Sequence, residues 1–164
     1  IAIRGYMDEV GSRGKLTLSV NPFIPKPQTP FQWLAMENMK SITKKMDYLN
    51  KEIKKISGIE IIAESPKEAY IQAILARGNR KIGDVILTAH IMGGVKSFKK
   101  ALKQYNLSEE ACLYREFAEN EILPWNNIDI GVTSEYFKEE LIKAKQGLKT
   151  IECFEGCKRC GVCD

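Results

Sequence analysis

The sequence predicts an α/β protein with a small parallel sheet and a mostly helical remainder. The segments 15–20 (KLTLSV) and 59–63 (IEIIA) are short and rich in β-forming residues, as strands are. Between them, from Met36 to Ile56, apolar residues recur every three or four positions, which is the spacing of one helix face. A strand, a long helix and a second strand form a right-handed unit with parallel strands. Because parallel sheets normally have several neighbouring strands, we expect the end of a larger sheet or barrel.

Start and stop signals bound the remaining elements. Asn21-Pro22 ends the first strand, and SPKE at 65–68 is typical of a capping box that starts a helix. That helix should end near Arg77, because the following Gly78 is a common helix stop. Similar signals predict further helices at residues 81–92, 96–105, 108–123 and 133–146. The expected organisation is strands and long helix at 1–63, a helical extension at 64–147 and a cysteine-rich tail at 148–164.

The composition of the chain indicates which cellular compartment and which classes of partner to expect. A chain of 164 residues can bury a core without disulfides. It has no apolar run of bilayer length and no charged-then-apolar leader, so we expect no membrane partner and a cytoplasmic location. The net charge of +4 is too small to indicate nucleic-acid binding by itself. Since the chain begins at Ile1 and not at a methionine, we expect a piece of a longer protein.

The long predicted helix carries a lysine-rich face. Its lysines are Lys40, Lys44, Lys45, Lys51, Lys54 and Lys55. A solvated surface is the favoured interpretation of such a face, and contact with RNA or a protein partner is the alternative.

Four of the five cysteines lie close together near the C-terminus, at Cys153, Cys157, Cys160 and Cys163. Reduced thiols in this number predict a metal site, because they suit either an iron-sulfur cluster or tetrahedral zinc. The glycines at 156 and 161 allow turns that bring thiolates together, and the adjacent Lys158 and Arg159 lower thiol pKa values. A free reducing tail is the alternative. The remaining Cys112 is expected in the core.

A proline-rich segment, LTLSVNPFIPKPQTPFQW, covers residues 16–33. Its prolines fix an extended, stiff path after the first strand. Loops at this end of a strand carry the binding groups of α/β barrels, so the segment is a candidate binding loop. The alternative is a rigid connector whose Phe23, Phe31 and Trp33 pack beneath the next helix.

This segment, together with ILARGNRKIGDVILTAH at 74–90 and CKRCGVCD at 157–164, resembles the C-terminal region of radical SAM proteins that carry a cobalamin-binding-type domain, the Fe-S oxidoreductases. The resemblance implies a C-terminal fragment of a partial TIM-type barrel, with two or three strands, a mostly helical extension and the cysteine-rich tail. The intact parent would use SAM and a [4Fe-4S] cluster, held by the missing N-terminal part, to form a 5′-deoxyadenosyl radical acting on an unknown substrate. Asn21 and Phe23 would face SAM, and Gln28 stands where family members commonly have histidine.

The spacing of Cys153, Cys157 and Cys160 equals that of the radical SAM cluster motif, which the family places after its first barrel strand. Here four residues follow Cys160, too few to build a SAM pocket, so we expect no radical SAM activity from this chain alone. The second hypothesis is a non-catalytic iron-sulfur or zinc module for electron transfer or docking. Open strand edges also predict that the fragment forms a homodimer.

Other polar residues are weaker candidates. His90 lies at the edge of an apolar helix stripe and is expected to be structural. Arg77, Asn79 and Arg80 lie at a turn between helices, where anion binding and ordinary capping or ion pairing explain them equally well. Glu119 and Glu121 are expected on a solvated face.

Overall fold

The computed structural model of the chain describes residues 2–163. Its elements are α1 (Ala2–Glu9), β1 (Leu16–Val20), α2 (Met39–Ile53), β2 (Ile59–Ala63), α3 (Pro66–Arg77), α4 (Ile82–Ile91), the 3₁₀ turn η1 (Gly94–Ser97), α5 (Phe98–Gln104), the π-helical turn η2 (Glu110–Tyr114) and α6 (Ser134–Lys145). Two compact units divide the chain: one holds the residues up to Phe23 with Glu37–Tyr70, and the other holds Ile24–Met36 with the chain from Ile71 onward. No helix within residues 2–163 is long and apolar enough to cross a membrane.

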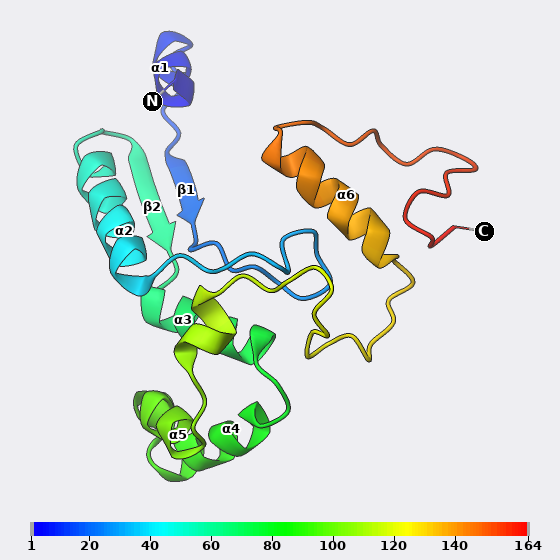
Figure 1. Ribbon diagram of the computed structural model, residues 1–164. Coiled ribbons are helices and arrows are strands. Elements are labelled where there is room, and N and C mark those ends of the chain that lie inside the picture. The colour runs from blue at the N-terminus through cyan, green and yellow to red at the C-terminus, as the bar shows by residue number, and fades with distance from the viewer. Residues whose placement is uncertain (1, 164) are drawn as a thin grey trace. The chain divides into compact units, whose positions relative to one another are not determined.

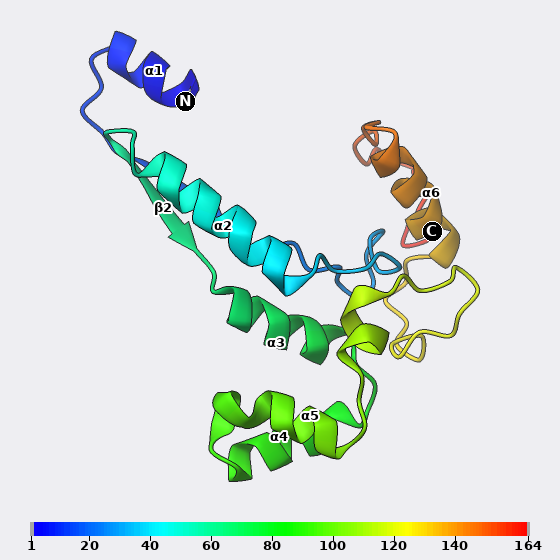
Figure 2. The ribbon, with the colours of Figure 1, turned by 60° about the vertical axis from the view of Figure 1, so that its left-hand side comes forward.

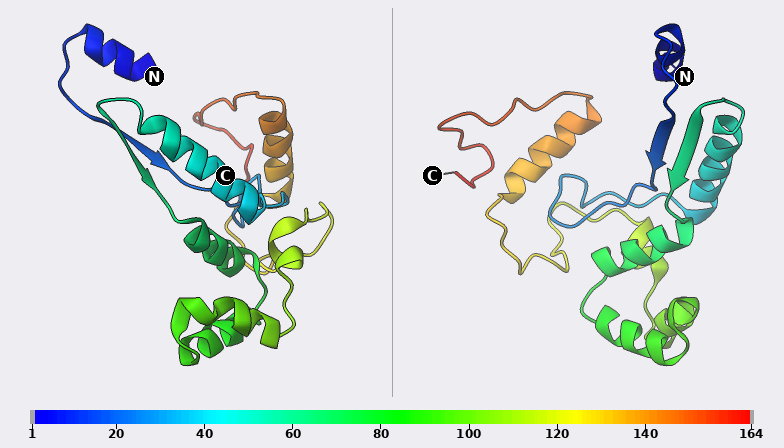
Figure 3. Two further views of the ribbon diagram at one scale, coloured as in Figure 1. Left: turned by 90° about the vertical axis from the view of Figure 1, so that its left-hand side faces the viewer. Right: turned by 180° about the vertical axis from the view of Figure 1, so that it is seen from behind.

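The first unit contains the sheet. Strands β1 and β2 pair in parallel, with Leu16 opposite Ile59 and Val20 opposite Ala63 (Figure 1). Helix α2 connects them and packs along β2, and its Ile42 and Met46 are buried. Figure 3 shows both strands beside this helix. Side chains of β1 alternate between half-buried and exposed, so one face of the sheet is covered and the other is open.

Helix α2 is shorter at both ends than the expected span from Met36 to Ile56. It starts after Asn38, whose side-chain Oδ1 accepts a hydrogen bond from Ser41 N at 2.9 Å. Met36 belongs to the other unit, where its N–H donates to the Leu113 carbonyl at 2.7 Å. The Asn38 side-chain cap and the long-range hydrogen bond of Met36 therefore determine where α2 begins. The apolar periodicity alone predicted a start that is too early in the sequence.

Helix α1 has no counterpart among the sequence expectations. Arg4 stabilises it and the turn that follows, because its guanidinium binds the Asp8 carboxylate from Nε at 3.1 Å and from Nη2 at 2.6 Å. The same guanidinium donates to the carbonyls of Ser12 and Gly14 at 3.1 and 2.7 Å. Arg4 is only 7% exposed. A short helix held by one arginine leaves little periodic signal in a sequence.

In the second unit, helices α4 and α5 pack against each other (Figure 2). Their contact buries Val85 and Ala89 of α4 with Ala101 of α5, and the hydroxyls of Thr88 and Tyr105 are hydrogen-bonded at 2.9 Å. A separate aromatic cluster consists of Trp33, Phe117, Leu123, Trp125, Phe137 and Leu141. The proline-rich segment and α6 both contribute to this cluster.

The prediction of a helix at residues 108–123 is wrong. The chain makes only the π-helical turn η2, and Arg115 leaves it in an extended conformation. Phe117 then donates its N–H to the Trp33 carbonyl at 2.8 Å, and its ring meets Trp125 edge to face with centroids 5.9 Å apart. Burial in the aromatic cluster and this long-range bond outweigh the helical periodicity of the segment.

Candidate functional site

The cysteine tail turns sharply at two glycines. Gly156 and Gly161 have φ of 78° and 84°, the left-handed conformation in which glycine is unstrained. Cys157 is buried and Cys160 is half-buried, whereas Cys153 and Cys163 are exposed. Within residues 2–163, no three cysteine, histidine or acidic side chains are grouped so that they could hold a metal ion. The ligand chemistry thus suits zinc or an iron-sulfur cluster, but the arrangement of the thiols in this structure does not.

Arg159 organises the tail around Cys157. Its Nε donates to the Cys157 sulfur at 3.1 Å, and its Nη2 donates to the carbonyls of Ile151 and Glu152 at 2.7 and 3.1 Å. The hydrogen bond from the Arg159 side chain lowers the pKa of the Cys157 thiol, and a bond from the Arg159 backbone lowers it further. Cys157 is therefore converted to the nucleophilic, metal-binding thiolate more readily than an ordinary cysteine is.

The tail is fastened to the start of α6. Thr133 caps this helix by accepting a bond from Tyr136 N at 3.3 Å, and its own N–H donates to the Cys160 carbonyl at 2.9 Å. Figure 1 shows the C-terminal segment returning toward this end of α6. A Cβ on Gly161 would lie 2.8 Å from Thr133 Cγ2, so any larger residue would push the tail away from the helix. The sequence marked these glycines as turns but did not identify Thr133 as their contact.

Asn21 and Phe23 follow β1 at the carboxyl edge of the sheet. Asn21 Oδ1 accepts a hydrogen bond from Glu64 N, the residue directly after β2, at 3.3 Å. Phe23 is 59% exposed. The two residues are therefore near the carboxyl ends of both strands in the first unit, whereas the tail cysteines belong to the second unit.

The rest of the proline-rich segment packs into the aromatic cluster. Trp33 is 4% exposed and Phe31 lies against the cluster. The connector interpretation expected them beneath the next helix, but their partners in the cluster come from residues 117–141. Gln28 has a φ of 55°, and its Nε2 donates to the Ile128 carbonyl at 2.7 Å. Gln32 Oε1 accepts from the Trp125 indole at 2.7 Å. These amides fix the connector, and they line a polar pocket of about 260 Å³.

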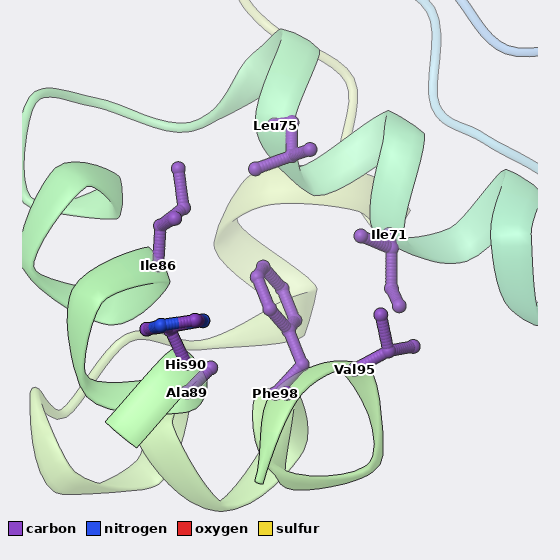
Figure 4. A pocket seen from close by; sticks show the side chains of 8 residues that line it. Ile71, Leu75, Ile86, Ala89, His90, Val95 and Phe98 are labelled. Atoms are coloured by element: carbon purple, nitrogen blue, oxygen red, sulfur yellow. The ribbon is translucent and has the colours of Figure 1, made fainter. Parts of the chain in front are cut away.

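His90 is exposed and lies at the edge of an apolar pocket of about 250 Å³ between α3, α4 and α5. Figure 4 shows the Phe98 ring between Ile71 and Leu75 of α3 on one side and Ile86 of α4 on the other, with the imidazole nearby. Apart from His90, the residues that line this pocket are apolar or glycine. The lining thus gives the imidazole no carboxylate partner for acid-base chemistry.

The turn between α3 and α4 separates the residues that the sequence grouped there. Arg77 is 1% exposed, whereas Asn79 and Arg80 are exposed. Asn79 Oδ1 accepts a bond from Lys81 N at 3.0 Å, which is a local cap. Gly78 is required at this turn, because a Cβ there would lie 2.3 Å from Ile82 Cγ1.

Arg77 also lines a pocket of about 280 Å³ with Arg115 and Glu121, residues that are distant in the sequence. Sequence reasoning placed Glu121 on a solvated face and did not single out Arg115. No spacing signal links them to Arg77, since only the packing of η2 brings them together.

Comparisons with known proteins give one partial similarity. No protein-family model matches the chain, and no solved structure matches it. An uncharacterised protein of Methanocaldococcus jannaschii is 41% identical over 68 residues. The aligned segment covers 42% of this chain and 15% of that protein's length. This chain is therefore similar, over part of its sequence, to a small portion of a much longer protein.

Proposed function

We propose that this chain is the C-terminal portion of a radical SAM Fe-S oxidoreductase. The segments at 16–33, 74–90 and 157–164 support this proposal by their resemblance to that family. The observation that carries it is the parallel pair of β1 and β2 joined by α2, which forms a two-stranded sheet within residues 2–163, since parallel strands usually belong to larger sheets. The similarity to a small part of a longer protein agrees with it.

In this proposal the carboxyl ends of β1 and β2 form part of the barrel rim where substrates bind. Asn21 is held there by Glu64 N, and its side-chain NH₂ is directed by that bond. Phe23 offers an exposed ring two residues further on. Together they would contact SAM, with the amide donating hydrogen bonds and the ring packing against an apolar surface. In the parent, a [4Fe-4S] cluster and SAM held by the rest of the barrel would supply a 5′-deoxyadenosyl radical, with methionine as the leaving group, for hydrogen abstraction from the substrate.

The proposal requires a longer parent protein, and it is tested by comparing this chain with that parent. Both are reconstituted anaerobically with iron and sulfide, given SAM and dithionite, and assayed for 5′-deoxyadenosine. We expect product from the longer protein alone, and less of it from its Asn21→Ala variant. Absence of product from the longer protein would overturn the proposal. Turnover by this chain that disappears in Cys153→Ala would show instead that the tail is itself a radical SAM motif.

A second candidate function is a non-catalytic iron-sulfur or zinc module for electron transfer or docking. The specific observation in its favour is the thiol-rich tail with a lowered Cys157 pKa, since metals bind thiolates. Metal binding would have to draw the exposed Cys153 and Cys163 toward Cys157 and Cys160. Such coupling between folding and metal binding is common in short cysteine-rich segments.

Metal analysis and a UV-visible spectrum of anaerobically purified protein test this second function. We expect zinc or iron in near-stoichiometric amount, lost in Cys157→Ser and retained in Cys112→Ser, the matched change outside the tail. A cluster absorbs in the visible range and zinc does not. The module would be excluded if the purified protein contained neither zinc nor iron and all its thiols titrated as free.

A further inference from the structure

The buried guanidinium of Arg77 has a hydrogen-bond donor that no protein group satisfies. Its Nε donates to the Cys112 carbonyl at 3.0 Å, and its Nη1 donates to the carbonyls of Pro25 and Gln32 at 3.3 and 3.1 Å. Nη2 is buried and has no hydrogen-bond partner among residues 2–163. Buried polar groups are nearly always paired, so a donor of this kind indicates a missing acceptor.

The charge of Arg77 has no carboxylate partner, because none of the ion pairs in the described part of the chain includes it. Its guanidinium carbon lies 4.6 Å from the centroid of the Phe117 ring, a cation–π contact that offsets part of the charge but offers Nη2 no hydrogen-bond acceptor. The nearby Arg115 is a second cation, but both its terminal nitrogens bind the Glu121 carboxylate, at 2.8 and 2.5 Å. Burial raises the pKa of the Cys112 thiol, so this group stays neutral near pH 7. Because burial of a lone charge is costly, the site favours an anion over a neutral acceptor such as water.

The shape and lining of the pocket narrow the class of anion. Its volume of about 280 Å³ exceeds the size of a bare inorganic ion. Its lining combines the two arginines with apolar side chains, among them Leu107, Ile122 and Pro124. One unbalanced positive charge is matched by one negative charge, and a planar guanidinium matches a planar carboxylate.

We propose that this pocket binds the carboxylate of a small organic acid, with Arg77 Nη2 donating to a carboxylate oxygen and Ile122 packing against the carbon body. Nη2 has no solvent-exposed surface in this structure, so rim side chains must move to admit the ligand. Ile122, which is 86% exposed, lines the pocket and offers an apolar surface to the ligand. The site does not depend on the proposed radical chemistry, because its lining comes from the end of α3, the turn that follows and residues 106–124, and not from the strand ends assigned to SAM.

Titration of the full chain, followed by amide chemical shifts in NMR, tests the proposal with benzoate as the probe. Benzamide is the matched neutral probe and inorganic phosphate is the second anion. We expect saturable shifts at the pocket residues, with benzoate binding at least about tenfold more tightly than benzamide. Equal binding of benzoate and benzamide, or tighter binding of phosphate, would overturn the assignment.

Two sets of variants locate the binding. Arg77→Gln should abolish benzoate binding if its amide spectrum remains that of a folded protein. Because Arg77 also holds three backbone segments, the second set leaves it unchanged: Ile122→Glu supplies an internal carboxylate at the rim, and Ile122→Gln is its neutral isostere. We expect Ile122→Glu to weaken benzoate binding at least about tenfold relative to Ile122→Gln. Equal binding by the two Ile122 variants, or shifts confined to surface lysines, would contradict a site at Arg77.

Discussion

Arg159 donates a hydrogen bond from Nε to the sulfur of Cys157 at 3.1 Å, and both residues lie in the only stretch of the chain that concentrates cysteines. The same guanidinium holds the carbonyls of Ile151 and Glu152, eight and seven residues earlier. One arginine therefore closes the tail into a loop and at the same time favours the thiolate form of the cysteine inside it.

We predict that Cys157 reacts as a thiolate at lower pH than an ordinary cysteine does. The Arg159 hydrogen bond lowers its pKa from the ordinary value of 9.0. The rate of alkylation by iodoacetamide, resolved for each cysteine by mass spectrometry across pH, measures this. In Arg159→Gln the midpoint for Cys157 should rise toward the ordinary value of 9.0, whereas Lys158→Gln, the adjacent charge removal, should change it less. An unchanged midpoint in Arg159→Gln would contradict the role of this contact.

The sign of the linked stability follows from the direction of that shift. A thiol with a lowered folded pKa stabilises the folded tail when it is ionised, fully above the unfolded value of 9.0, and loses this contribution as pH falls through the lowered value. Protection of the tail from proteolysis should therefore rise between neutral pH and about pH 9 in the wild type and rise less in Arg159→Gln.

Arg77 should contribute strongly to the stability of the second unit. Arg77→Ala leaves the carbonyls of Pro25, Gln32 and Cys112 without their donor, and each buried unsatisfied acceptor costs about 1–3 kcal/mol. We expect a loss of about 3–5 kcal/mol in the free energy of unfolding, measured with urea. Arg80→Ala, at an exposed neighbour, should change it by no more than about 0.5 kcal/mol. Similar losses in the two variants would mean that the Arg77 contacts do not stabilise the unit.

The ion pair between Glu121 and Arg115 should produce a stability difference that depends on pH. Hydrogen bonds from Arg115 are the main cause that lowers the pKa of the Glu121 carboxyl from 4.5. Its contribution is present above that value and lost as pH falls through the lowered one. Glu121→Gln should be less stable than the wild type by about 0.2–1 kcal/mol at neutral pH and equally stable near pH 3. A difference that persists in acid would have a cause other than the carboxylate charge.

The open strand edges should promote self-association. Within residues 2–163 the sheet has two strands, so each has one edge without a strand partner, and Ile62 on the open face of β2 is 62% exposed. We expect dimers at about 100 μM by light scattering, far above the micromolar dissociation constants of modest interfaces. Ile62→Lys should shift the chain to monomer, whereas Thr43→Lys on α2, with the same change in charge, should not. A wild-type monomer at this concentration would contradict association through the strand edges.

Local signals in the sequence located most of the regular elements. Pro66 and Gly78 bracket α3, and Thr133 and Gly147 bracket α6, because helix ends depend on caps and stops a few residues away. The parallel pairing of β1 and β2 followed from the strand–helix–strand order. The tail's glycines were recognisable as turns for the same reason: the positive φ at Gly156 and Gly161 is a property of single residues.

Tertiary structure alone decided the features that depend on contacts between distant residues. Residues 108–123 have helical periodicity, yet only the single turn Glu110–Tyr114 is helical. The hydrogen bond from Phe117 N to the Trp33 carbonyl and the burial of Phe117 prevent the helix from continuing. Arg77 and Arg80 look alike in the sequence, but only Arg77 is buried, because the carbonyls that receive it come from segments 35 to 52 residues away. The cysteines are close in sequence, but within residues 2–163 they are not grouped as metal ligands. Their spacing determines how near the backbone brings them, whereas side-chain contacts such as that of Arg159 with Cys157 determine where each sulfur lies.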